Sequence, residues 1–243
     1  MKRPAPDSLI AALGERYALE DSILGQLEAL ADSVANDPAA PTTVSDPGAI
    51  ARDHLADSLV ALELPAVREA TQIADLGSGA GFPGLPLAVA LPTARVSLVE
   101  SNARKCAFMQ RAIEASGADN AAAVHARAES WRDGIGACDL VTARALAPLV
   151  VVAEYAAPLL AQGGALVAWR GRRDPEDEAA AARAASALGL QIGDVIHVEP
   201  YPGALHRHLH VMVKVALTPD RFPRRPGMAR KRPLGAASDR SQR

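Results

Sequence analysis

The first seventy residues carry hydrophobic side chains at the three- and four-residue spacing of amphipathic helices. Leu9, Leu13 and the run at 23–34 follow this spacing, and three prolines in residues 36–47 interrupt it. Proline blocks a continuous helix because it lacks the backbone N–H and clashes with the preceding turn. We therefore expect residues 1–70 to form a helical extension with a break in its middle.

A further helix is predicted to begin at Asp46 and to run to Pro65. Asp46 suits the N-cap, and Pro47 suits the first turn, where no intrahelical N–H is needed. His54 and Asp57 are three positions apart on this helix, so they share a face and can pair.

From residue 71 the rhythm changes to short apolar runs that alternate with helical patterns, which favours a mostly parallel sheet covered on both faces. The last two strands are joined without a helix, so we expect them to pair antiparallel. Strands are predicted at residues 72–76, 95–100, 121–126, 138–143, 164–169, 190–199 and 208–215, with helices at 85–91, 103–116, 149–160 and 175–188.

A glycine-rich turn, DLGSGAGFPG at residues 75–84, follows the first predicted strand and opens a helix. Ligands of open α/β sheets bind at the carboxyl ends of the strands, and glycines let the backbone approach them closely. The spacing from Gly77 is Gly-x-Gly-x-Gly, and Phe82 stands where a dinucleotide fold places its third glycine. This disfavours, without excluding, a pyrophosphate cradle.

Glu100 ends the second predicted strand, where an acid can accept hydrogen bonds from both hydroxyls of a ribose. Nicotinamide-dependent and S-adenosylmethionine-dependent enzymes both bind the ribose of their cofactor with an acidic residue at this position. The glycine-rich turn and Glu100 together indicate an adenosyl ligand. The simpler alternative is a tight turn beside a surface glutamate with no ligand.

For a methyltransferase, the residues also narrow the methyl acceptor. Enzymes that act on exocyclic amines often carry Asp/Asn-Pro-Pro-aromatic after the fourth strand, where this chain has residues 142–145, Thr-Ala-Arg-Ala. Cytosine-5 enzymes need a nucleophilic cysteine, whereas Cys106 and Cys138 are placed like buried structural thiols. A target that needs neither base nor nucleophile fits best, and N7 of guanine is one, so catalysis would be mainly positioning and electrostatics.

Arg144 follows the fourth predicted strand and is expected to face the ligand cleft. Its guanidinium can hold a carboxylate or phosphate or stack on a base, and we assign it a positioning role in catalysis. A surface salt bridge is the alternative.

Charge is distributed unevenly along the chain. Residues 214–243 hold nine Lys/Arg and two Asp, a net charge of +7, so the remaining residues carry −9 of the overall −2. A basic arm on an acidic body suggests a polyanionic partner. We expect residues 217–243 to be a flexible basic arm that contacts phosphates together with Arg170 or Arg207, and we expect truncation after Val215 to spare cofactor affinity.

The chain resembles the ribosomal RNA small subunit methyltransferase G family, also called glucose-inhibited division protein B, over about residues 40–232. Its most specific segment is IADLGSGAGFPGLPLA, and the others are SDPGAIARDHLADSL, RAESW, TARALAPL, WRG, HRHLHVMVKV and RRPGMARKRPL, all in the family's order. It departs from the family at Asp53 and Arg170, where Arg and Lys are usual.

The resemblance implies an α/β class I S-adenosylmethionine-dependent methyltransferase: a Rossmann-like domain at 71–216 with a seven-stranded, mostly parallel sheet and an antiparallel last strand. It implies methylation of N7 of guanine 527 in the 530 loop of 16S ribosomal RNA, free or in the 30S subunit or its precursor. The cofactor-binding residues that it and the Glu100 argument suggest are Gly77, Phe82, Glu100, Ala128, Glu129 and Arg144.

Other features carry weaker expectations. His206, His208 and His210 alternate on one strand face, but no carboxylate stands nearby at a metal-site spacing, so we expect no metal. The chain has no apolar run long enough to cross a bilayer and no signal peptide, so we expect a cytoplasmic protein without membrane partners. No heptads suggest an oligomer, and we expect a monomer. A small-molecule methyltransferase, a nicotinamide-dependent oxidoreductase and a non-catalytic RNA-binding protein remain competing classes.

Overall fold

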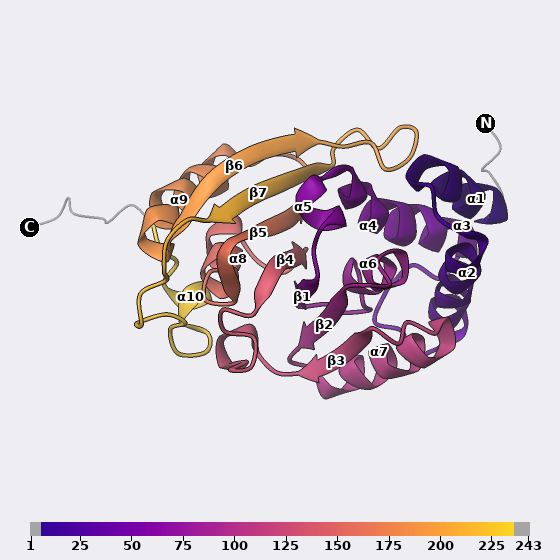
Figure 1. Cartoon of the computed structure of the whole chain (residues 1–243), viewed down its shortest axis with the longest axis horizontal. Helices are drawn as coiled ribbons and strands as arrows, with labels where there is room; N and C mark the ends of the chain where they lie inside the picture. The colour runs from indigo at the N-terminus through magenta and orange to yellow at the C-terminus, as the bar shows by residue number, and fades with distance from the viewer. Residues whose placement is uncertain (1–5, 236–243) are drawn as a thin grey trace, which may run out of the picture.

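The computed structural model describes residues 6–235 and centres on one seven-stranded sheet in the order β3-β2-β1-β4-β5-β7-β6 (Figure 1). All neighbouring strands pair in parallel except those of β7, which runs antiparallel to both β5 and β6. The predicted sheet and its antiparallel last strand are thus confirmed. The strands are β1 (Gln72–Leu76), β2 (Arg95–Glu100), β3 (Ala121–His125), β4 (Cys138–Arg144), β5 (Leu160–Arg170), β6 (Leu190–His197) and β7 (His208–Lys214).

Helices cover both faces of the sheet because successive strand residues point to opposite sides. Ile73 belongs to a hydrophobic cluster with the N-terminal helices, α6 and α7, and the next residue, Ala74, belongs to a second cluster with α8 and α9. These helices are α6 (Gly84–Ala90), α7 (Ala103–Ser116), α8 (Leu149–Ala156) and α9 (Pro175–Ala185). Short 3₁₀ turns at Ala128–Ser130 and Ser186–Leu188 complete the set.

Two helices, α1 (Pro6–Tyr17) and α2 (Asp21–Asn36), open the described chain; α2 packs against α7, and α1 packs against α2 (Figure 1). Leu27, Leu30 and Val34 of α2 are buried, as the helical spacing predicts. They join the same cluster as the sheet residues of that face. The extension therefore shares its core with the sheet.

The segment at 46–65 is helical, but it is not the single regular helix that the sequence predicts. Asp46 does cap it, because its carboxylate accepts a hydrogen bond of 2.8 Å from the backbone N–H of Ala49. A π-helical stretch, Ala51–Ala56, interrupts it, and such widened turns are common at functional sites. The remaining pieces are α3 (Pro47–Ile50), α4 (Asp57–Leu59), a 3₁₀ turn (Val60–Glu63) and α5 (Pro65–Arg68).

Among the predicted strand bounds, the start of β5 differs most from the structure, and the other bounds agree within two residues. α8 ends at Ala156 and β5 already begins at Leu160, four residues earlier than expected, so Gly163 with its positive φ of 84° lies inside the strand. A register shift against β4 accommodates it. In β6, at the sheet edge, a second register shift between Ile192 and Val195 leaves two residues out of the ladder.

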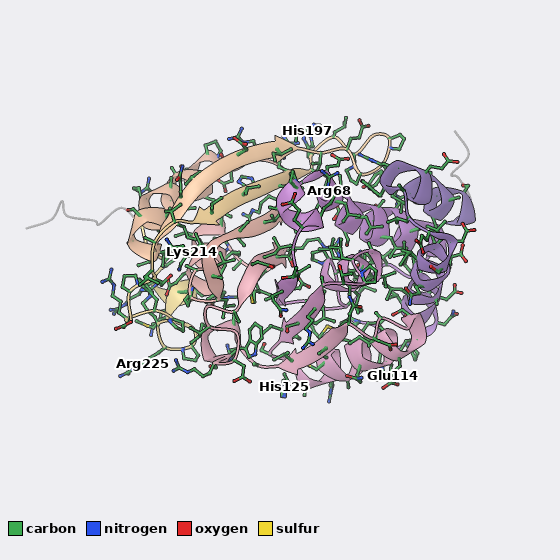
Figure 2. The ribbon with its side chains drawn as sticks, in the orientation of Figure 1. Arg68, Glu114, His125, His197, Lys214 and Arg225 are labelled. Carbon is green, nitrogen blue, oxygen red and sulfur yellow. The ribbon has the colours of Figure 1, made fainter. Side chains whose placement is uncertain are left out.

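The basic segment from residue 217, which we expected to be a flexible arm, lies against the domain as far as Gly235. Phe222 and Ala229 are buried, and α10 (Met228–Lys231) packs on α8 (Figure 1). Arg224 forms a two-pronged ion pair with Glu154 of α8, whereas Arg225 is exposed at the periphery (Figure 2). Residues 236–243, the rest of the expected arm, lie outside the described residues.

Among the helices of residues 6–235, none combines the length and the apolar character that crossing a membrane requires.

Candidate active site

A cavity of about 360 Å³ opens at the carboxyl ends of β1, β2 and β4, where the topology of an open α/β sheet places ligands. Four residues singled out from the sequence, Gly77, Glu100, Ala128 and Glu129, line it. We call it the cofactor cavity. Its other lining residues are Val99, Ser101, Lys105, Ala126, Arg127, Ala145, Leu146, Tyr155, Gly227 and Arg230.

Gly77 is the residue of the glycine-rich loop that lines the cofactor cavity. Gly77 has a φ of 67°, and its N–H donates a hydrogen bond of 2.8 Å to the carbonyl of Val99 on β2. A Cβ atom at this position would lie 2.5 Å from Cδ1 of Leu146. Only glycine satisfies both the backbone angle and the space.

The buried carboxylate of Asp75, on β1, holds the glycine-rich loop in place through hydrogen bonds. Its two oxygens accept a hydrogen bond of 2.9 Å from Thr142 Oγ1 on β4 and one of 3.3 Å from the N–H of Gly84. Burial raises the pKa of Asp75, while these donors oppose the shift. The sequence analysis missed this role, although a polar residue at the end of a buried apolar strand was a signal for it.

Glu100 projects into the cofactor cavity from the end of β2. Its side chain is held by the backbone N–H groups of Asn102, at 2.8 Å, and Gly79, at 3.3 Å. Lys105 Nζ lies 4.0 Å from it. A carboxylate fixed in this way retains lone pairs for two ribose hydroxyls. Apolar side chains such as Val99 and Leu146 line the same cavity and suit an adenine ring.

The far wall of the cofactor cavity comes from the basic C-terminal segment. The N–H of Gly227 donates a hydrogen bond of 2.9 Å to Glu129 Oε1, and Arg230 donates one of the same length to the carbonyl of Leu146. Sequence reasoning placed this segment only with RNA and missed its contribution here. Removing it would therefore be expected to affect the cofactor as well.

Phe82 and Arg144, the other two predicted site residues, do not line the cofactor cavity. Arg144 donates a hydrogen bond of 2.8 Å to the carboxylate of Asp57, and its guanidinium lies 5.5 Å from the centre of the Phe82 ring. Phe82 in turn stacks on His54, with ring centres 4.5 Å apart.

The expected pairing of His54 with Asp57 is absent from the hydrogen bonds of the described chain. His54 Nε2 lies 2.9 Å from the hydroxyl of Thr42. The carboxylate of Asp57 accepts hydrogen bonds from Arg144 and, at 3.0 Å, from Arg207. Burial and the Arg144 charge lower the pKa of His54, so its ring is neutral at pH 7.

Around these groups lies a second cavity of about 470 Å³, which we call the arginine pocket. Ala145 lines both the arginine pocket and the cofactor cavity, so the two are neighbours. The arginine pocket is lined by Asp53, His54, Asp57, Arg144, Ala145, Trp169, Arg170, Gly171, Arg172 and Arg207.

The alternating histidines do not converge. His206 Nε2 lies 3.4 Å from Arg172, His208 Nδ1 lies 2.8 Å from the carbonyl of Gly171, and His210 is buried near Glu178. No cluster of three metal-binding side chains occurs in the part of the chain that the structure describes. Cys106 and Cys138 are buried and unpaired, as predicted, and burial raises both thiol pKa values.

Structures with the same architecture include a methyltransferase of Aquifex aeolicus described as dependent on S-adenosylmethionine, with a TM-score of 0.57 and 14% identity. That match covers 74% of this chain and 99% of the other. The fibrillarin of Aeropyrum pernix, solved with natively bound S-adenosyl-L-methionine, has a TM-score of 0.52 at 19% identity and covers 65% and 73%. Both show the class I methyltransferase fold.

Sequence relatives are nearer. The Ribosomal RNA small subunit methyltransferase G of Chloroflexus aggregans is 44% identical over 199 residues, covering 79% of this chain and 82% of the relative. That of Pelotomaculum thermopropionicum is 38% identical over 200 residues with the same coverage. A family profile, rRNA small subunit methyltransferase G, matches residues 26–202. With that match and these relatives, the chain belongs to the rRNA small subunit methyltransferase G family.

Proposed function

We propose that this protein methylates N7 of guanine 527 in 16S ribosomal RNA, using S-adenosylmethionine. Membership of the methyltransferase G family over residues 26–202 carries the proposal. The cofactor cavity supports it, since its carboxylate, glycine loop and apolar walls suit an adenosyl group. When bound, S-adenosylmethionine supplies a methyl group on a positively charged sulfur, which an electron pair can attack.

Within the cofactor cavity, each residue has a binding role in this proposal. Glu100 accepts hydrogen bonds from the ribose hydroxyls, and Ala128 and Glu129 flank the adenine. Gly77 lets the backbone come close to the ligand because it lacks a side chain. Phe82 supports the loop from outside the cavity through its stack on His54.

Methyl transfer to N7 of guanine requires the protein mainly to position the two reactants. N7 of guanine has a free lone pair and carries no proton, so methylation there needs no general base. With S-adenosylmethionine bound, the chain's residues would need only to hold N7 of the guanine in line with the methyl group. Arg144 is the positioning residue that we assign to this step, because it lines the arginine pocket and its guanidinium lies beside Phe82 of the glycine-rich loop.

The partner and setting follow from that activity. We propose that the 16S RNA is met as part of the 30S subunit or its precursor, in the cytoplasm, by a single copy of the chain. The exposed cations of residues 217–235, such as Arg225, suit RNA phosphates, and binding should weaken steeply with salt because phosphate contacts release counterions. Residues 1–70, 71–216 and 217–243 remain our proposed division into helical extension, methyltransferase domain and basic segment.

Methyl transfer from radiolabelled S-adenosylmethionine tests the proposal, with 30S subunits and 16S RNA from a strain lacking this gene as acceptors. Borohydride–aniline cleavage then locates any N7-methylguanine. Subunits from the parent strain, already methylated, serve as the matched control. A single modified guanine in the 530 loop is the expected result. No label in either acceptor, with cofactor binding intact, would refute it.

A further inference from the structure

We propose that the arginine pocket receives the target guanosine, with its base beside His54 and its phosphates on Arg172 and Arg207. This inference rests on the proposed function and assigns the acceptor to a particular cavity. Three observations carry it: the place of the pocket, its unbalanced charge, and an aromatic stack at its wall.

The arginine pocket lies where a methyl acceptor must be. It adjoins the cofactor cavity through Ala145, the residue that follows the end of β4. Ala145 has a φ of 53°, unusual for a residue with a side chain. Such strain persists only where the surroundings impose it, and it clusters at ligand sites. A nucleotide in this pocket would therefore sit next to a donor in the other cavity.

The charges around the arginine pocket do not cancel. Asp53 is already paired with Arg52, and Arg170 with Asp177. Asp57 is one carboxylate shared between Arg144 and Arg207.

Arg172 forms no ion pair with a carboxylate among residues 6–235, and its guanidinium lies 3.4 Å from Nε2 of His206. Two positive charges are thus left over. A pair of flanking phosphodiesters would supply two negative charges.

Asp57 keeps this arrangement rigid. It is buried, and its backbone carbonyl accepts a hydrogen bond of 2.7 Å from Nε1 of Trp169. Arg207 also contacts the hydroxyl of Tyr201 at 3.4 Å. The guanidinium of Arg207 is therefore held in place before RNA arrives, which lowers the entropic cost of binding a phosphate.

A stacking surface completes the pocket. The ring of His54 lines it, and the ring of Phe82, which is buried and does not line it, stacks on His54 at an interplanar angle of 22°. Bases stack on aromatic side chains in proteins that bind single-stranded RNA. A guanine can extend this stack, which a simple inorganic anion cannot use.

The test compares two neighbouring arginines. Arg172→Ala removes the unpaired cation of the pocket, while Arg173→Ala removes an equal charge from a residue paired with Glu178 and outside the pocket. Steady-state methylation of 30S subunits lacking the modification gives kcat and KM, and titration gives the Kd of S-adenosylmethionine.

For Arg172→Ala we expect KM for the subunit to rise at least tenfold, an unchanged cofactor Kd, and a log–log salt slope of RNA binding smaller by about one. Arg172→Lys should recover part of the lost affinity, because the charge returns without the planar fork. Arg173→Ala should keep KM within about twofold.

Equal KM values for Arg172→Ala and Arg173→Ala, with a wild-type protein that methylates guanine normally, would overturn the pocket assignment alone. A wild-type protein that labels no guanine would overturn the proposed function, and the pocket assignment with it.

Discussion

The ion pair between Arg224 and Glu154 joins the basic C-terminal segment to α8, and Arg224→Ala tests what it holds. Glu154 is 2% exposed, and its two carboxylate oxygens accept hydrogen bonds from two nitrogens of the Arg224 guanidinium. Breaking a buried pair by removing one partner costs about 3–5 kcal/mol, because a charge stays buried without compensation. The Arg224 side chain is 22% exposed, so water can reach the vacated site, and we expect the lower end, about 3 kcal/mol.

In a chain of this length each kcal/mol lowers the melting temperature by about 2–4 °C, so Arg224→Ala should melt about 6–12 °C below the wild type. Its cofactor affinity should also fall, because Gly227 and Arg230 line the cofactor cavity and follow Arg224 closely in sequence. A loss of about tenfold corresponds to one hydrogen bond, that from Gly227 to Glu129.

Calorimetric melting and titration with S-adenosylmethionine measure both effects. Arg225→Ala is the matched control, since it removes the same charge from the adjacent, exposed position (Figure 2). It should melt within about 1 °C of the wild type, because isolated surface charges contribute little. An Arg224→Ala protein that melts with the control and binds cofactor as the wild type does would refute the reasoning.

Three further predictions concern single residues. Arg144→Ala should slow methyl transfer more than tenfold, about 1.4 kcal/mol of barrier, and unchanged turnover at saturating cofactor and RNA would remove Arg144 from the reaction. Glu100→Gln should raise the Kd of S-adenosylmethionine about tenfold or more by titration, because hydrogen bonds to a charged acceptor contribute about 1.5–3 kcal/mol; a Kd within twofold of the wild type would argue against ribose binding there. Burial lowers the pKa of Lys214 to about 8, so the folded chain releases this proton before the unfolded chain does, and this residue's contribution to the free energy of unfolding should rise from pH 8 to 10.5. Denaturant titrations of Lys214→Met across that range should lack this part of the rise, and identical pH profiles for variant and wild type would contradict it.

Much of the sheet could be predicted because its pattern is local. Residues 72–76, 95–100 and 103–116 have the predicted bounds, since each apolar run ends at turn or capping residues. The cap at Asp46 followed from the same kind of signal. The start of β5 could not be found in this way, because Gly163 and Gly164 look like a turn, and only pairing with β4 draws residues 160–163 into the strand.

The candidate site was less predictable, because it depends on contacts between distant segments. Gly77, Glu100, Ala128 and Glu129 converge as expected, since they follow strands that end at one edge of the sheet. The arginine pocket takes Asp53 and His54 from the π-helical stretch at Ala51–Ala56, and its Asp57 pairs with Arg144 and Arg207, which no local pattern encodes.

One feature of the sequence does indicate that a cation from another segment packs against α8. Glu154 stands in the apolar run LVVVAEYA of α8, and an acid in a helix that is hydrophobic on all sides needs a buried cation. The sequence offered a surplus of arginines after residue 220 but gave no reason to choose Arg224 among them.

The register shift in β6 bears on how this sheet behaves at high concentration. An edge strand offers free N–H and C=O groups to which another molecule's strand can add. In β6 the row of backbone N–H and C=O groups is interrupted where Gly193 and Asp194 do not pair with β7. Asp194 places an exposed negative charge at this interruption. A second sheet that tried to extend this edge would lose its hydrogen-bond register after two or three residues and would meet a carboxylate there. The irregularity thus protects an otherwise open flank from ordered aggregation.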